Sequence, residues 1–308
     1  LSAFTAFVCN DDMDAAVHST WLCNEYGVDT ISAGACIAFA MECAEFGLLA
    51  GYGKDVDLSW GSSGVLAEMV KLISLREGIG DLLADGVRKA SERLGEKTKA
   101  FAIHCKGLEG PAHDGRSGKA LQIAYATASR GMCHIHPLEA MAYDSGKMDW
   151  NLMSHGLKDP ELVDRWDESG KGKAVKILQD GLIVPDILNV CKFFMYAGIT
   201  LEHLAAMYSA STGFEMTATD LITTGERVMT LHRLFTLREG LSRSDDALPL
   251  RVLEKPEFGI YQNEENCAVA DFDAMLDEYY DARDWSRDEG RPSEVKLESL
   301  GLTGLAGI

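Results

Sequence analysis

The sequence has little positive charge. It contains 29 Lys and Arg residues against 48 Asp and Glu residues, which gives a formal net charge of −19 at pH 7. A surface of this sign repels phosphate backbones and anionic lipid headgroups, so the composition argues against nucleic acid and against a membrane surface as partners. The excess of acidic residues serves either solubility alone or the steering of a partner, and the composition leaves both open.

Targeting signals and long apolar runs are also missing. No basic segment followed by an apolar core marks a signal peptide after Leu1. The longest apolar run, Ile31 to Met41, is too short to cross a bilayer and is interrupted by Gly34. These features predict a cytoplasmic protein. Because the chain starts at Leu1 without an initiator Met, we expect it to be part of a longer protein.

The sequence has no CxxC pair and no dense cysteine framework. Its eight cysteines are scattered through apolar segments, which is typical of reduced, intracellular proteins. Most are expected to be buried as small apolar side chains. Familiar catalytic motifs are missing as well, because there is no HExxH, no P-loop and no G-x-S-x-G. Gly78 and Gly80 lack the third glycine and the preceding strand of a dinucleotide site.

Apolar residues recur with the 3.6-residue period of helices along most of the chain. One helix is expected after Asp11 and Asp12, running to Tyr26. Further helices are expected at Thr30 to Leu49, Val65 to Leu75, Ile79 to Leu94, Ala120 to Ala128, Lys173 to Asp180, Ile187 to Tyr196, Leu201 to Thr212, Thr217 to about Leu237, Phe272 to Tyr280 and Pro292 to Leu300.

Strand signals are few. Lys99 to Cys105 alternates like a short strand, and Glu109 to Gly118 is a Gly- and Pro-rich loop. Without a regular alternation of strands and helices, the pattern predicts an all-α protein and excludes a doubly wound nucleotide domain. Residues 145–172 are polar and separate two helical halves. We therefore expect two helical domains, at residues 1–170 and 171–308.

Polar chemistry is concentrated in the irregular segment from Arg130 to Pro137, RGMCHIHP. His134 is suited to donate or accept a proton near neutral pH. The alternative is a buried loop whose histidines are satisfied by hydrogen bonds. A zinc site formed by Cys133, His134 and His136 is disfavoured, because ligands this close in sequence do not easily point at one ion.

Two hexapeptides look alike, NEYGVD at Asn24 to Asp29 and DILNVC at Asp186 to Cys191. Each has a short polar residue, then Gly or Asn three residues on, a β-branched apolar residue and a final residue able to bind a ligand. Such turns at helix ends present backbone N–H groups and a carboxylate to a polar ligand. Taken alone, the pairing is also compatible with chance similarity.

These segments resemble, in the same order, the C-terminal helical part of the aldehyde ferredoxin oxidoreductase family, which are tungsten or molybdenum enzymes of anaerobes. The resemblance runs almost end to end. It is carried by LCNEYGVDTISAG, REGIGDLLADGV, KGLEGPAHDGR, YATASRGMCH and DILNVCKF, and near the end by YYDARDW and GRPSEVKLESLGL. The resemblance implies an all-α fold whose two helical domains correspond to domains 2 and 3 of that family.

The resemblance also implies a tungsten (or molybdenum) bis-pterin cofactor and a nearby 4Fe-4S cluster. In the family, two D-x-x-G-L-(D/C) turns grip the pterins. The first is matched by Asn24, Val28 and Asp29, and the second by Asp186 and Val190, followed by Cys191. Asn24 replaces the first Asp and Asn189 replaces the second Gly. Asn tolerates the left-handed backbone, so the turn is expected to survive.

Several single residues take roles from the same resemblance. Cys191 matches the fourth cluster ligand, and the three other ligands lie outside this chain. His134 matches a proton-transfer histidine near the metal. Arg130 and His136 match positions that contact pterin, although a longer basic side chain is common at the position of His136. A glutamate near tungsten in some members falls close to His18, which indicates a different substrate pocket.

The expected function is therefore the C-terminal part of an oxidoreductase that oxidises an aldehyde to a carboxylic acid. Its expected partners are ferredoxin or an iron-sulfur subunit and a small-molecule substrate, and a homodimer is allowed. One alternative is the active-site subunit of an aromatic acyl-CoA reductase of the benzoyl-CoA type. Another is a non-catalytic helical fragment without cofactor, and we expect the chain alone to be inactive.

Overall fold

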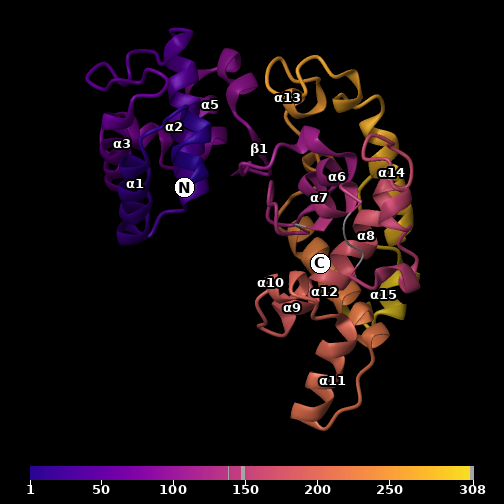
Figure 1. The fold of residues 1–308 in the computed structure, drawn as a ribbon. Helices are drawn as coiled ribbons and strands as arrows, with labels where there is room; N and C mark the ends of the chain where they lie inside the picture. The colour runs from indigo at the N-terminus through magenta and orange to yellow at the C-terminus, as the bar shows by residue number, and fades with distance from the viewer. Residues whose placement is uncertain (138, 147–149, 306–308) are drawn as a thin grey trace. The chain divides into compact units, whose positions relative to one another are not determined.

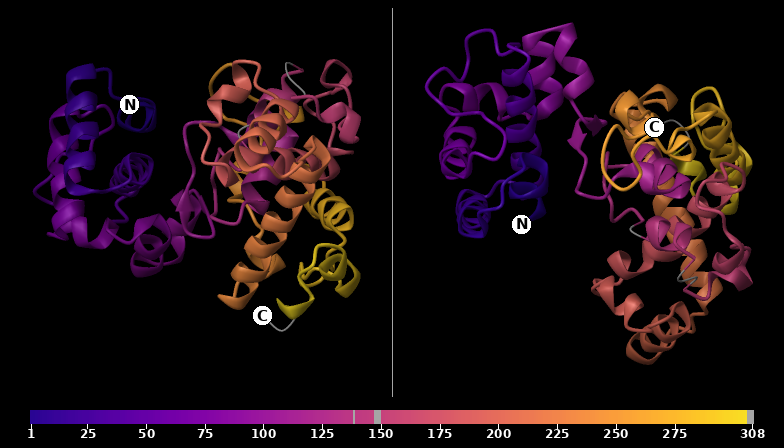
Figure 2. Two further views of the ribbon diagram at one scale, coloured as in Figure 1. Left: turned by 90° about the horizontal axis from the view of Figure 1, so that it is seen from below. Right: turned by 45° about the horizontal axis from the view of Figure 1, so that its top comes forward.

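Helical periodicity along the sequence is realised as helices in the structure, a computed structural model that describes residues 1–137, 139–146 and 150–305. Strands within these residues are limited to the two-residue β1 (His104–Cys105) and β2 (Leu108–Glu109), which pair antiparallel. The prediction of an all-α fold is confirmed. The chain divides into two compact units (Figure 1), and Figure 2 shows their helices from two further sides.

The first unit comprises residues 1–114, 130–133 and 248–251. Its helices are α1 (Met13–Tyr26), α2 (Thr30–Glu45), α3 (Leu66–Leu75), α4 (Ile79–Leu83) and α5 (Gly86–Leu94). Short 3-10 helices lie at Ser2–Phe4, Ala6–Val8, Ser63–Val65 and Glu96–Phe101.

Helix α2 forms the centre of the first unit. Its buried side chains, among them Ile37, Phe39 and Met41, belong to one core cluster with residues of the neighbouring helices. Cys36 and Cys43 are both buried in this cluster. Gly34 lets the N-terminal 3-10 helix approach closely, because a Cβ there would lie 2.4 Å from the carbonyl oxygen of Ala3.

The second unit is formed by the described residues within 115–129, 134–247 and 252–308. Its main helices are α6 (Lys119–Thr127), α7 (Glu139–Asp144), α8 (Lys171–Leu182), α9 (Val184–Ile187), α10 (Phe193–Tyr196), α11 (Leu201–Thr212), α12 (Ala218–Arg238), α14 (Phe272–Arg283) and α15 (Glu294–Ser299). Helix α13 (Leu250–Leu253) carries residues of both units. Further 3-10 helices lie at Gly115–Ser117, Leu152–His155, Pro160–Leu162, Arg243–Asp245, Glu265–Cys267 and Thr303–Leu305.

Helix α8 is the centre of the second unit, and two glycines allow its neighbours to cross it closely. A Cβ at Gly172 would lie 2.5 Å from the backbone nitrogen of Tyr279 on α14. A Cβ at Gly225 of α12 would lie 1.9 Å from the carbonyl oxygen of Asp180 on α8. Any larger side chain at these positions pushes the helices apart.

The expected strand at Lys99 to Cys105 is wrong for most of its length. The chain forms a 3-10 helix at Glu96–Phe101. Only the last two residues of the expected strand, His104 and Cys105, pair as β1. The Thr98 hydroxyl donates hydrogen bonds to the carbonyl oxygens of Gly95, at 2.8 Å, and Ser91, at 3.2 Å. These local bonds after α5 favour the turn over the strand.

The helix expected from Ile79 to Leu94 is two helices. It breaks between α4 and α5, where Gly86 has a φ of +87°. The buried Glu109 carboxylate accepts a hydrogen bond from the N–H of Val87 at 2.8 Å and so satisfies a backbone donor at the new helix start. A residue of the hairpin therefore stabilises a break that local periodicity does not reveal.

The expected domain boundary after residue 170 does not coincide with a boundary of the two compact units, whose first long stretch ends at Asp114. As a division into the family's domains, it remains a prediction. No individual helix in the described part of the chain is long and apolar enough to cross a membrane. Only the bent pair α1 and α2, at 119° to each other, passes a test of length and composition.

Arg283 is fully buried and should make a large contribution to stability. Its guanidinium pairs with Asp180, so Arg283→Met leaves a buried carboxylate without its closest partner. We expect a loss of about 3–5 kcal/mol in the free energy of unfolding, measured by urea denaturation.

Arg287→Met is the matched control, because Arg287 pairs with Asp281 on the protein surface. It should leave the denaturation midpoint unchanged. Equal effects of the two substitutions would contradict the role given to Arg283.

Candidate active site

The first of the two similar hexapeptides lies between α1 and α2. Gly27 ends α1 in the left-handed conformation, with φ of 71°. The N–H of Val28 donates to the carbonyl of Cys23 at 2.9 Å, and that of Gly27 donates to the carbonyl of Asn24 at 3.3 Å. This pair of bonds is the Schellman arrangement that closes a helix. Asp29 then caps α2, because its carboxylate accepts from the N–H of Ser32 at 2.8 Å.

The second hexapeptide has the same backbone hydrogen bonds. Asn189 takes the left-handed conformation, with φ of 56°. The N–H of Val190 donates to the carbonyl of Pro185 at 2.8 Å, and that of Asn189 donates to the carbonyl of Asp186 at 3.3 Å. The helix expected from Ile187 to Tyr196 is therefore wrong, because this turn divides it into α9 and α10.

The two turns also expose corresponding positions. Asn24 and Asp186 are exposed at the first position, and Asp29 and Cys191 are exposed at the last. The apolar fifth residue is partly buried in each turn. A polar or ligand-forming side chain thus flanks each turn on both sides, as a site that grips a polar cofactor requires.

Cys191 carries an exposed thiol directly before a short helix. Its carbonyl accepts from the N–H of Phe194 at 3.0 Å. The next residue, Lys192, is the N-cap of α10, whereas Asp29 is itself the N-cap of α2. A thiolate is a ligand for iron, and a 4Fe-4S cluster needs four. The described residues contain no group of three or more His, Cys, Asp or Glu arranged to hold a metal. The residue type and exposure of Cys191 therefore fit one ligand of a cluster.

Two side chains fix the backbone of the segment that contains His134 and His136. The ammonium of Lys192 donates to the carbonyl of Ile135 at 2.8 Å, and the amide of Gln179 donates to the carbonyl of His136 at 3.4 Å. Both imidazoles are partly buried and both form further interactions. The segment is a positioned loop, as expected for residues that handle a proton or a ligand.

Gln179 connects this loop to the buried charges of the second unit. Its Oε1 accepts from the Tyr279 hydroxyl at 2.7 Å and from the Arg283 guanidinium at 2.8 Å, while its Nε2 also donates to Thr127 Oγ1 at 3.1 Å. All these groups are buried, and a satisfied buried network of this kind is rigid.

Arg130 and Cys133 belong to the first unit, where their segment packs on the hairpin of β1 and β2. Gly131 has a φ of 106°, and a Cβ there would lie 2.4 Å from the carbonyl oxygen of Cys105. Arg130 is exposed and Cys133 is buried. An exposed guanidinium fits the expected role in binding an anionic cofactor, whereas the buried Cys133 does not fit a ligand role.

His232 of α12 lies near Ser129 and Asp186 in the second unit, although no local motif marks it in the sequence. Its Nδ1 lies 3.4 Å from the Ser129 hydroxyl, within the second unit. Burial lowers the pKa of His232, and the negative charge of Asp186 partly opposes this. The ordinary α12 periodicity hides this residue, because its position depends on the packing of α9 against α12.

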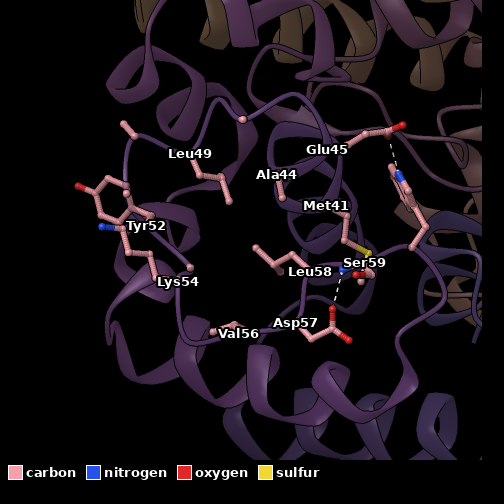
Figure 3. A pocket seen from close by; sticks show the side chains of 15 residues that line it. Met41, Ala44, Glu45, Leu49, Tyr52, Lys54, Val56, Asp57, Leu58 and Ser59 are labelled. Atoms are coloured by element: carbon pink, nitrogen blue, oxygen red, sulfur yellow. Dashed lines mark hydrogen bonds between the residues drawn. The ribbon is translucent and has the colours of Figure 1, made fainter.

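An open cavity of about 700 Å³ lies elsewhere in the first unit, beneath the loop after α2 (Figure 3). The Trp60 indole donates to the Glu45 carboxylate at 2.8 Å, and Asp57 accepts from the N–H of Ser59 at 3.2 Å. All lining residues fall between Met41 and Trp60, so the cavity includes none of the expected site residues.

The pair of turns agrees with the similarity of the chain to known proteins. The family model for aldehyde ferredoxin oxidoreductase, domains 2 & 3, matches residues 1–302, and the chain belongs to this family. The tungsten-containing aldehyde ferredoxin oxidoreductase of Pyrococcus furiosus is 32% identical over 300 residues, which are 95% of this chain and 46% of that protein. The corresponding enzyme of Thermococcus kodakarensis is 31% identical, with the same shares. The chain thus spans about half the length of these relatives.

A solved structure shows the same fold. It is the active-site complex of benzoyl coenzyme A reductase with 1,5-dienoyl-CoA, which matches with a TM-score of 0.74 and 21% sequence identity. The match covers 96% of this chain and 47% of that chain. At this identity the likeness concerns the fold alone.

The left-handed turns give a direct test of their equivalence. Gly27→Ala and Asn189→Ala each force an unfavourable left-handed alanine, so each should lower the free energy of unfolding by about 1 kcal/mol in urea denaturation. Gly64→Ala is the control, because no atom lies within 4 Å of its Cβ position and its φ is not left-handed. The shared geometry is wrong if the two turn variants match this control.

The lowered pKa of His232 predicts that the stability of the fold depends on pH. The pKa in the folded state lies below the unfolded value of about 6.5, so the contribution of His232 to the free energy of unfolding is complete above that pH. The contribution is lost as the pH falls from there to the folded pKa, because the buried ring must then take up a proton. His232→Gln should therefore reduce the difference between denaturation midpoints at pH 7.5 and 5.5, and an undiminished difference would refute this.

Proposed function

We propose that this chain is the C-terminal, cofactor-binding part of a tungsten-pterin oxidoreductase with a 4Fe-4S cluster. The complete enzyme would oxidise an aldehyde to a carboxylic acid. The main support is membership of the family together with the two hexapeptides, Asn24 to Asp29 and Asp186 to Cys191, which share residue types and exposed positions. Their helix-closing hydrogen bonds also occur at other helix ends, such as Arg76 and Gly240. Membership of the family, whose named relatives contain tungsten, supports the choice of metal over a cofactor-free role.

The residues divide into three tasks. Asn24, Val28, Asp29, Asp186 and Val190 hold the pterins through the two turns. Cys191 supplies one thiolate to the cluster, and the three others come from outside these residues. Arg130 and His136 contribute basic side chains to pterin binding, and His134 moves the proton.

The reaction adds the oxygen of water to the aldehyde carbon and removes two electrons and two protons, giving the acid. Held by the two turns and by Cys191, the metal and the cluster would supply the acceptor for these two electrons and their one-electron transfer to a partner. His134 then accepts a proton at its imidazole, held by the backbone bonds to Ile135 and His136. Ferredoxin or an iron-sulfur subunit receives the electrons. We infer a location in the cytoplasm of an anaerobe, where a homodimer is allowed.

A second candidate keeps the cofactor and changes the substrate to an aromatic acyl-CoA thioester, which would be reduced. It is favoured by one observation, the exposed His18 stacked on Trp21 at 5.7 Å, where some family members carry a glutamate. A non-catalytic helical fragment is the remaining alternative.

Metal analysis separates these candidates first. Protein purified without oxygen from the full reading frame should contain tungsten and about four irons per chain. It should reduce ferredoxin with aldehydes and show no reduction of aromatic acyl-CoA thioesters. The opposite substrate preference would favour the second candidate, and purified protein without either metal would favour the fragment.

His134→Ala should bind the same amounts of metal and lose about two to four orders of magnitude in kcat, the range for removal of a general acid or base. His155→Ala, which replaces a histidine outside the expected site, is the control. Unchanged turnover of the His134 variant would remove it from the reaction.

A further inference from the structure

Lys192 is the residue next to the expected cluster ligand, and it joins the two parts of the candidate site in the second unit. Its ammonium lies 2.8 Å from the carbonyl oxygen of Ile135 and 3.1 Å from the carboxylate of Asp186. The lysine side chain is only 11% exposed. One cation therefore bridges the turn that ends at Cys191 and the loop that carries His134 and His136.

The bond to Ile135 is the stronger of the two that fix this loop. Its donor is charged and its length is 2.8 Å, whereas the neutral amide of Gln179 reaches His136 only at 3.4 Å. Charge-assisted hydrogen bonds are shorter and about twice as strong as neutral ones. The position of the loop should therefore depend more on Lys192 than on Gln179.

The neighbouring position of the two side chains has a further consequence. The thiol of Cys191 is exposed, while the adjacent lysine extends into the protein to the histidine loop. The side chain of one residue thus joins the turn at Cys191 to the peptide between the two imidazoles. A simple surface ion pair with Asp186 would not do this, because such pairs contribute little and impose no geometry on a distant loop.

We propose that Lys192 is a positioning residue that fixes the His134–His136 loop relative to the turn of Cys191. It would thereby couple the residue proposed for proton transfer, His134, to the residue proposed as a cluster ligand, Cys191. We call the two contacts of Lys192, with Ile135 and Asp186, the clamp. Its role in catalysis rests on the proposed function, but the two contacts are a property of the chain. Lys192 is not proposed to contact the substrate or the reacting atoms.

Hydrogen–deuterium exchange of the full chain tests the clamp without reference to activity. Lys192→Met keeps the length of the stem and removes the charge, so amide exchange in residues 130–137 should accelerate by about tenfold or more, as expected from the loss of one charge-assisted bond. Lys192→Arg should restore protection. Lys173→Met, which replaces an exposed lysine of α8, is the control and should leave this segment unchanged.

Asp186→Asn distinguishes the clamp from the ion pair. It removes the carboxylate partner but leaves the bond from Lys192 to Ile135, so exchange in the loop should rise less than in Lys192→Met. Equal acceleration in the two variants would overturn the proposal, because the ion pair alone would then account for the effect. Unchanged exchange in Lys192→Met would overturn it as well.

The same variants in the metal-loaded protein test the coupling. Lys192→Met should lower kcat by about tenfold with KM nearly unchanged and shift the electron paramagnetic resonance signal of the cluster, and Lys192→Arg should recover both. Loss of protection without any change in kcat or in this signal would refute the coupling. If exchange responds as expected but the protein contains no metal, the clamp stands and the proposed function fails.

Discussion

The guanidinium of Arg283 lies wholly inside the second unit, between α8 and α14. Removing a charge from water costs several kcal/mol, so such a group needs a charged partner and hydrogen-bond acceptors. Asp180, Gln179, the Tyr279 hydroxyl and the carbonyl of Lys176 supply them. Gln179 in turn reaches the carbonyl of His136. The interaction that fixes the helix packing of this unit therefore also fixes one side of the candidate site.

A second constraint is the left-handed residue that closes a helix, which recurs in both units and includes Gly27 and Asn189. A helix that ends at Gly27 or Asn189 reverses its backbone within two residues, which satisfies the last carbonyls and exposes the next side chains of the turn. The difference between the turns lies in their final residue. Asp29 offers a carboxylate and caps the long helix α2, whereas Cys191 offers a thiol before the short helix α10. One backbone geometry thus presents two different side chains, a carboxylate and a thiol, after the turn.

The sequence predicted features that depend on neighbouring residues. Helix starts after Asp12, at Thr30 and at Thr217 were predicted. In the structure the side chains of Asp12, Asp29 and Thr217 each accept a hydrogen bond from an N–H three residues ahead. The C-terminal ends of α1 and α11 agree with the sequence as well, because a left-handed glycine follows each of them. The similarity of the two hexapeptides was visible in their letters, although only the structure supplied the matching hydrogen bonds. The roles of their residues in binding a cofactor stay predictions.

The errors have two physical causes. The strand expected at Lys99 to Cys105 and the helix expected from Ile187 to Tyr196 are interrupted by local turns, whereas other features depend on distant residues. The break between α4 and α5 depends on Glu109, which is 22 residues from Val87 in sequence, and the position of the histidine loop depends on Lys192, 57 residues from Ile135. By itself the sequence determined the helical class, the caps and the family, because each is written in local periodicity or in contiguous motifs. Only the tertiary structure decided which side chain reaches which backbone group, because Lys192 and Ile135, like Glu109 and Val87, lie far apart in the sequence and meet only in the folded chain.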